Sequence, residues 1–198
     1  MTDKALATKL ADELIYVINN LFGMYITSCV GLEMYSQKLR EFIPEKDLDN
    51  RFHAGRGNPK LGTAKTNYST TGRIGIALAE RDGVHQNLLA CAFLIFLYTY
   101  WDTEFRVKYE AALGLKKNGI ALDEFGDLRN IRHAVIHNKG ILDRDMKVFT
   151  SFKVGEELHL IQQVMEDMLH SILDAVCKMH LDQTGEKLHS RDVVFMNP

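Results

Sequence analysis

The stretch from Asp127 to Gly140, DLRNIRHAVIHNKG, carries two arginines and two histidines within nine residues. On a helix with about 100° per residue, Arg129, Arg132, His133 and His137 share one arc of roughly 140°. The opposite face is apolar and is expected to face the core; it carries Leu128, Ile131, Ala134 and Val135. The pattern therefore predicts a helix that presents two guanidinium and two imidazole groups together.

Three interpretations compete for this arc. The first is an ordinary solvated helix face. The second is a metal site built on His133 and His137, whose i, i+4 spacing is that of H-E-x-x-H sites. However, no glutamate follows His133, no further ligand cluster lies nearby in the sequence, and two arginines would repel a divalent ion. We therefore expect no metal and no other cofactor.

The third interpretation is acid–base chemistry on a phosphodiester. An imidazole can take a proton from a ribose 2′-hydroxyl or give one to a leaving 5′-oxygen near neutral pH. A fixed guanidinium stabilises the charge that develops on the phosphoryl oxygens. Ile136 lies in the middle of the charged arc. An apolar side chain at that position suggests that the face is covered, for example by another subunit.

Long helices are predicted on both sides of this stretch. Apolar residues recur at three- and four-residue steps from Asp3 to Phe42, and Pro44 ends that pattern. The apolar run Leu88–Trp101 spans 14 residues, fewer than the ~20 needed to cross a bilayer, and predicts a buried helix from His85 to about Leu113. A last amphipathic helix is expected from about Leu160 to Leu181. The fold class is thus all-α, a bundle of four principal helices.

The connecting segments are less regular. Residues 44–84 are rich in Gly, Ser, Thr and Asn and predict a long loop insertion after the first helix, without the spacing of a phosphate-binding loop. This segment is also the most basic; it contains Arg51, Arg56, Lys60, Lys65 and Arg73. It is either a solvated loop or a contact for nucleic acid. We expect a small β-hairpin before the last helix, with its turn at Val154–Glu156, and a loose tail over residues 185–198.

The totals describe an ordinary globular chain. Its 198 residues fit one domain, residues 1–198, and its net charge of -2 gives no global attraction to phosphate backbones. Its three cysteines form no C-x-x-C pair, and the start of the chain lacks the apolar region of a secretory signal. We expect a soluble, cytoplasmic protein with reduced thiols and no membrane contact.

The segment RHAVIH, Arg132 to His137, resembles the R-x4-H signature of the HEPN superfamily of all-α domains, which includes many ribonucleases. The likeness extends over the flanking sequence LRNIRHAVIHNKGIL. The apolar run that leads into an aromatic–acidic pair, LIFLYTYWDTEFR, is similar to the family's second helix. The resemblance covers roughly residues 84–180 and implies a four-helix bundle with the motif toward the end of the third principal helix.

The resemblance implies roles for the matched residues. Arg132 would contact the scissile phosphate, His137 would be the general acid or base, and His133 would orient the pair. Asp102 or Glu104 on the second helix would pair with Arg132 and hold it. Two further residues are assigned supporting positions, Arg129 on the same arc and Asn138 at the helix end.

The implied activity is metal-independent endoribonuclease cleavage. The 2′-hydroxyl would attack to give a 2′,3′-cyclic phosphate and a 5′-hydroxyl. The implied partners are RNA, a second copy of the chain that completes a composite site, and an antitoxin or another component of a phage-defence system. The alternative is a noncatalytic HEPN module that binds RNA, a nucleotide or a protein partner, because a fold alone does not settle function.

Overall fold

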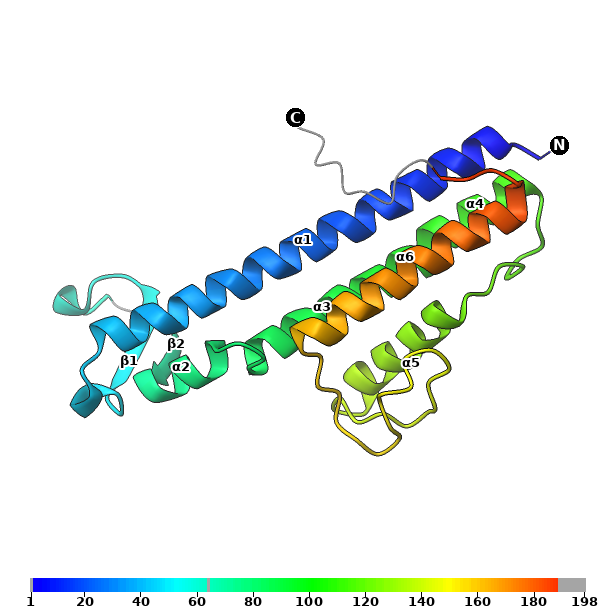
Figure 1. The fold of residues 1–198 in the computed structure, drawn as a ribbon. Helices are drawn as coiled ribbons and strands as arrows, with labels where there is room; N and C mark the ends of the chain where they lie inside the picture. Colours follow the sequence, from blue (N-terminus) through cyan, green and yellow to red (C-terminus); the bar gives the residue numbers. More distant parts are fainter. Residues whose placement is uncertain (1, 64, 189–198) are drawn as a thin grey trace. The chain divides into compact units, whose positions relative to one another are not determined.

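The computed structural model describes residues 2–63 and 65–188, and these residues are mainly α-helical, as the sequence predicts (Figure 1). In chain order the elements are α1 (Lys4–Phe42), η1 (Glu45–Asp47), β1 (Arg51–Arg56), η2 (Pro59–Leu61), β2 (Lys65–Thr71), α2 (Gly72–Ala79), α3 (Val84–Tyr100), η3 (Trp101–Phe105), α4 (Arg106–Leu113), α5 (Asp123–His137) and α6 (Gln162–Thr184). The expected long helices are confirmed to within a few residues at each end. Of the expected tail, residues 189–198 lie outside the described part of the chain.

The chain divides into two compact units. Unit 1 comprises residues 1–25 and 89–198, and unit 2 comprises residues 26–88. Unit 1 contains the beginning of α1, most of α3, and η3, α4, α5 and α6. Its core is formed by large apolar side chains that are nearly or fully buried, among them Leu14, Ile18, Leu94, Leu97, Trp101, Phe105, Leu128, Ile131, Met165 and Ile172.

A buried histidine joins three helices at one end of unit 1. His180 of α6 is fully buried, and its Nδ1 lies 2.8 Å from the hydroxyl of Tyr109 on α4. Its Nε2 lies 3.2 Å from the hydroxyl of Thr8 on α1 and 3.3 Å from that of Thr184. These polar partners satisfy both ring nitrogens, as a buried polar group requires. Burial lowers the pKa of His180 below its ordinary value, against the opposing charges of Glu186 and Asp12.

The helix α5 begins and ends as its sequence suggests. Asp123 and Glu124 stand in its first turn, where negative charge is favourable. At its end the left-handed residues are Lys139, with φ 54°, and Gly140, with φ 83°. Asn138, which precedes them, is not left-handed, because its φ is -129°. The Asn138 side chain instead donates a hydrogen bond of 2.6 Å to the carbonyl of Ile141 and fixes the turn that follows.

The prediction of a long loop over residues 44–84 is wrong. This segment of unit 2 contains an antiparallel two-stranded ribbon of β1 and β2, followed by α2. Threonines are frequent in β2, KTNYSTT, and favour extended backbone because their side chains are β-branched. Thr71 also ends the ribbon by capping α2, where its hydroxyl accepts a hydrogen bond of 3.2 Å from the amide of Ile74.

The hairpin expected before α6 is also corrected. Between α5 and α6 the described backbone forms turns and one isolated antiparallel bridge, between Ile141 and Glu157. The amide of Leu142 donates to the carbonyl of Glu156 at 3.0 Å, and Gly155, with φ 87°, turns the chain back. The apolar residues of this segment are buried one by one from an irregular backbone instead of lying on paired strands. They are Leu142, Met146, Phe149, Leu158 and Leu160.

In the described part of the chain, two helices are long and apolar enough to cross a membrane by length and composition alone. They are α1 and the continuous helical stretch Val84–Leu113. Buried helices of soluble proteins meet the same two criteria. The second stretch contributes Leu94, Leu97 and Trp101 to the core of unit 1.

Candidate functional site

The packing of α5 determines which of its side chains can meet a ligand. Leu128, Ile131 and Ala134 have no exposed surface and hold the helix on the core of unit 1. On the other side Arg129 and His137 are exposed, and Arg132 and His133 are partly exposed. Ile136 is 49% exposed among them. The structure therefore brings the predicted arginines and histidines to one accessible face, with an apolar side chain at its centre.

The two histidines of this face lie side by side but have different surroundings. Their ring centroids are 5.1 Å apart. His133 is held by a carboxylate, because its Nε2 lies 3.3 Å from Oδ2 of Asp143. The ring nitrogens of His137 have no hydrogen-bond partner among residues 2–63 and 65–188. His133 is thus oriented within the chain, whereas the nitrogens of His137 are open to a ligand.

The expected pairing of Arg132 with Asp102 or Glu104 does not occur. Asp102 accepts a hydrogen bond of 2.6 Å from Nη2 of Arg106, and Glu104 forms an ion pair of 2.7 Å with Lys108. Both partners lie four residues further along the same helical stretch, where side chains meet without any tertiary constraint. The guanidinium of Arg132 lies over the ring of Tyr98 instead, with its Cζ 5.9 Å from the ring centroid.

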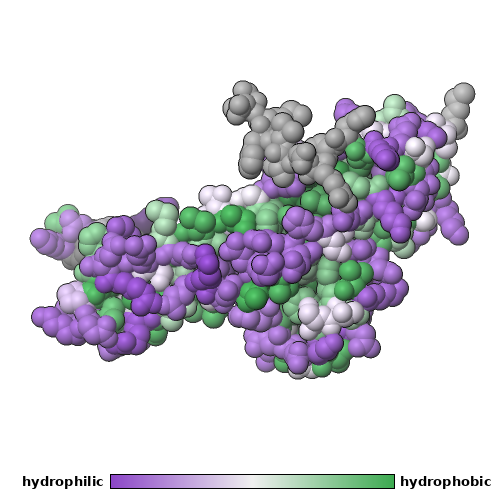
Figure 2. All heavy atoms as spheres, viewed as in Figure 1, coloured by the Kyte–Doolittle hydropathy of each residue, from purple (hydrophilic) through white to green (hydrophobic). Residues whose placement is uncertain are grey.

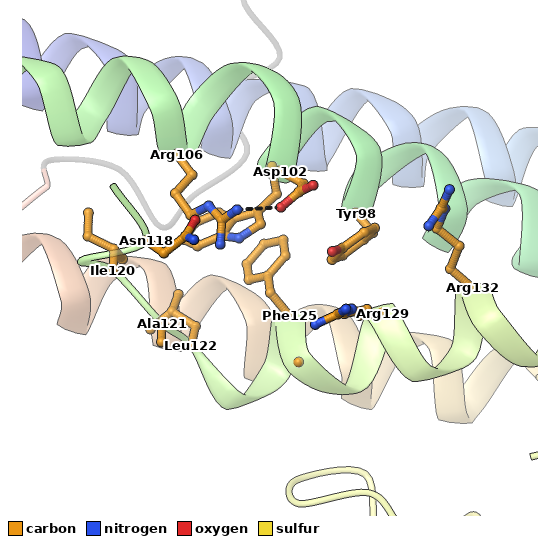
Figure 3. Close-up of a pocket in the computed structure, with 12 residues that line it drawn as sticks. Tyr98, Asp102, Arg106, Asn118, Ile120, Ala121, Leu122, Phe125, Arg129 and Arg132 are labelled. Atoms are coloured by element: carbon orange, nitrogen blue, oxygen red, sulfur yellow. Dashed lines mark hydrogen bonds and ion pairs between the residues drawn. The ribbon is translucent and has the colours of Figure 1, made fainter. Parts of the chain in front are cut away.

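A cavity of about 530 Å³ opens beside Arg132. Figure 3 shows the side chains of Tyr98, Asp102 and Arg106 on one side and those of Phe125 and Arg129 on the other. The lining residues come from α3, η3, α4, α5 and the connection before α5; they are Tyr98, Trp101, Asp102, Arg106, Asn118, Ile120, Ala121, Leu122, Phe125, Gly126, Arg129 and Arg132. Three guanidinium groups face one carboxylate in this lining, so the cavity has an excess of positive charge.

The phenol of Tyr98 experiences these charges directly. Burial raises the pKa of Tyr98 above its usual value, and the carboxylate of Asp102 raises it further. The guanidinium groups of Arg129, Arg106 and Arg132 act on this pKa in the opposite direction. Because the net direction is upward, the phenol stays protonated near neutral pH and can donate a hydrogen bond to an anion.

The connection that lines one side of the cavity is fixed by a buried carboxylate. Glu110 of α4 is 4% exposed, and its two oxygens accept hydrogen bonds of 3.1 Å from the amides of Asn118 and Ile120. Asn118 has a left-handed backbone, with φ 58°. This anchor holds the connection in a shape that lines the cavity. Within the cavity, Nε of Arg106 is buried without a hydrogen-bond partner among the described residues.

Sequence reasoning missed three residues of this site. Tyr98 and Arg106 stand four residues before and after Asp102, so helical spacing puts all three on one face. That spacing was a usable signal. Asp143 was not detectable in this way, because it reaches His133 through the irregular connection after α5.

Neither a metal centre nor a known relative identifies the site. Among residues 2–63 and 65–188 no group of three or more His, Cys, Asp or Glu side chains is placed to hold a metal ion. No family model, no curated protein and no solved structure matches this chain. The side chains on the exposed face of α5 and the adjoining cavity are therefore the features from which a function can be inferred.

Proposed function

We propose that this protein is a metal-independent endoribonuclease of HEPN type. One observation carries the proposal: the R-x4-H residues stand on an accessible helix face, and the ring of His137 has free nitrogens beside a second, oriented imidazole. The basic cavity next to Arg132 supports it, because a phosphate chain that reaches Arg132 would meet two further guanidinium groups there.

The proposed reaction uses these groups in separate roles. One imidazole takes the proton of a ribose 2′-hydroxyl, whose oxygen attacks the adjoining phosphorus. The bond from phosphorus to the 5′-oxygen breaks, and an imidazolium gives that oxygen its proton. The products are a 2′,3′-cyclic phosphate and a 5′-hydroxyl. Arg132 stabilises the charge on the phosphoryl oxygens, and His133, held by Asp143, keeps the neighbouring ring of His137 in place.

The reaction calls for a general acid and a general base. In the proposed assembly a second copy of the chain supplies the second set of Arg132, His133 and His137. The half-exposed Ile136 lies within the charged face, where burial against a twofold-related copy would remove it from water. We therefore propose a homodimer in which two α5 faces form one composite site. Phage defence or a toxin–antitoxin pair is the setting proposed for such an enzyme.

The test is RNA cleavage in EDTA with mapping of the fragment ends. Wild type is expected to leave 2′,3′-cyclic phosphate and 5′-hydroxyl ends, and His137→Ala to lose this cleavage. His170→Ala is the matched control, since His170 is an exposed histidine on α6 outside the site. If folded wild type does not cut RNA, or if His137→Ala cuts equally well, the catalytic assignment fails.

One observation favours a second candidate, a noncatalytic HEPN module that binds RNA, a nucleotide or a protein. Arg132 has no ion pair with any residue in the described part of the chain, so no carboxylate fixes its guanidinium within one copy. Ligand binding without cleavage at the basic cavity would be the outcome that selects this candidate.

A further inference from the structure

The ribbon of β1 and β2 carries exposed positive charge that has no ion-pair partner among the described residues. Residues 51–71 contain four cationic side chains, Arg51, Arg56, Lys60 and Lys65, and no aspartate or glutamate, in a chain whose net charge is -2. All four side chains are exposed, and none has an ion pair with a described residue. Figure 2 shows mostly hydrophilic side chains over the end of unit 2 that carries the ribbon.

The neighbouring Arg73 shows the contrast. It lies just beyond the ribbon, in α2, where its Nε is 3.0 Å from Asp49 and its Nη2 is 3.2 Å from Glu45. These carboxylates raise the pKa of Arg73. Acidic partners are thus available at the base of the ribbon and are absent along it.

The tip of the ribbon places like charges opposite one another. Arg56 and Lys65 are direct cross-strand partners in the register, and Lys60 lies in the short helix η2 between the strands. Like charges at directly opposite positions destabilise a ribbon. A bound anion would remove that repulsion.

The conformation of the ribbon tip, residues 55–63 and Lys65, is restrained by its backbone contacts. The register shifts between residues 54 and 55, and a Cβ on Gly55 would collide with the backbone carbonyl of Lys65, so only glycine fits. Asn58 shapes the turn, since its carbonyl accepts from the amide of Thr63 at 3.3 Å and its side chain from the amide of Lys60 at 2.9 Å.

The base of the ribbon is anchored to the rest of unit 2. Thr70 is 8% exposed, and a Cβ added at Gly75 of α2 would lie 3.4 Å from the ring of Phe52, so the ring occupies the space beside that glycine. The structure thus combines a packed base with an exposed, cationic tip that bears Asn and Thr hydrogen-bonding groups.

We propose that the ribbon tip binds the phosphate backbone of single-stranded nucleic acid through Arg56, Lys60 and Lys65. That the natural strand is RNA rests on the proposed function; binding through the tip does not. Neutralisation of phosphates by exposed cations is the dominant sequence-independent source of such affinity. An anionic membrane is the competing partner, because Leu61 at the tip is 74% exposed.

The experiment uses full-length His137→Ala protein, so that cleavage cannot interfere, and fluorescence anisotropy of labelled 20-nucleotide single strands of RNA and of DNA. The tip variant Arg56→Gln/Lys60→Gln/Lys65→Gln is compared with Lys9→Gln/Lys46→Gln/Lys178→Gln, which removes the same charge from exposed lysines elsewhere. Loss of three phosphate contacts should lower the slope of log affinity against log salt by about 2 and weaken binding at low salt at least ~10-fold. The control triple should lose no more than ~3-fold by nonspecific electrostatics.

Equal losses in the two triple variants, or no binding of either strand, would overturn the proposal. A third arm uses vesicles of phosphatidylglycerol and phosphatidylcholine with Leu61→Ser. If vesicle binding depends on Leu61 while strand binding does not depend on the tip cations, the surface is a membrane contact and the proposal is wrong. Because DNA binding is measured without catalysis, failure of the ribonuclease assignment leaves this result unaffected.

Discussion

Replacement of Asp127 by alanine should unfold unit 1 more readily than any charge change on its surface. Asp127 lies in the first half of α5 and is 1% exposed. Its carboxylate accepts hydrogen bonds from three consecutive amides, those of Lys147 at 2.9 Å, Val148 at 2.8 Å and Phe149 at 3.0 Å. This one side chain therefore fixes the connection between α5 and α6.

The loss in the free energy of unfolding depends on which of the three amides water can reach after the substitution. Lys147 is exposed, so its amide can be solvated, whereas Val148 is partly buried and Phe149 is buried. A buried donor left without an acceptor costs about 1–3 kcal/mol, so two such donors cost about 2–6 kcal/mol. At ~2–4 °C per kcal/mol for a chain of this size, the melting temperature should fall by roughly 4–24 °C.

Urea unfolding followed by the fluorescence of Trp101, the chain's single tryptophan, reports on unit 1 directly. Asp145→Ala is the matched control, because Asp145 lies in the same connection but its side chain is exposed. The control should change the free energy of unfolding by no more than about 0.5 kcal/mol. A loss below about 1 kcal/mol for Asp127→Ala, or equal losses for the two variants, would refute the anchoring role.

Three further predictions concern pH, thiol reactivity and the cavity. Since burial lowers the pKa of His180, the unfolded chain binds a proton that the native state lacks once the pH falls below about 6.5, so stability should decrease from pH 7.5 to 5.5. Melting curves should show a flatter pH dependence for His180→Gln; identical slopes would contradict this. Burial raises the pKa of Cys91 to about 11, so Cys91→Ala should leave the labelling of native protein by a disulfide reagent at pH 8 unchanged, and loss of a fast phase would show the thiol to be reactive. If RNA lies along the cavity, Arg129→Gln should raise KM several-fold at nearly constant kcat, whereas Lys178→Gln, which removes an exposed positive charge from α6 outside the cavity, should change neither; equal effects would argue against that path.

The helices were predictable because their signal is local. Apolar residues at three- and four-residue steps indicate which face packs inward, and on α5 the buried Leu128, Ile131 and Ala134 lie where that spacing places them. The ribbon was not predictable in the same way. Five of the seven residues of β2 are exposed, so no alternation of apolar and polar residues marks the strand. Its pairing with β1 depends on hydrogen bonds between two segments that are separated by a turn, and the residue pattern of either strand alone does not reveal that pairing.

In the candidate site, too, the features that depend on one helix were predictable and the contacts between helices were not. The common face of Arg132 and His137 follows from helix geometry and was anticipated from their spacing. The partner of Arg132 was not, because Asp102 on the neighbouring helix has a closer competitor, Arg106, one turn away on its own helix. Sequence spacing states which charges can meet within a helix, but not which of them remain available to another element.

The position of Asp143 shows how structural residues can determine the chemistry of this site. On one side of Asp143, Leu142 is 1% exposed and hydrogen-bonded to Glu156; on the other, the amides of residues 147–149 are held by Asp127. The backbone at Asp143 is therefore restrained from both directions, and its carboxylate is kept within 3.3 Å of His133. That contact occupies Nε2 of His133 and leaves the adjacent ring of His137 as the imidazole of the pair with open nitrogens. Weakening of the Asp127 anchor should therefore release His133 before it affects His137. A variant at Asp127 would thus distinguish the proposed orienting role of His133 from the proposed proton transfer by His137.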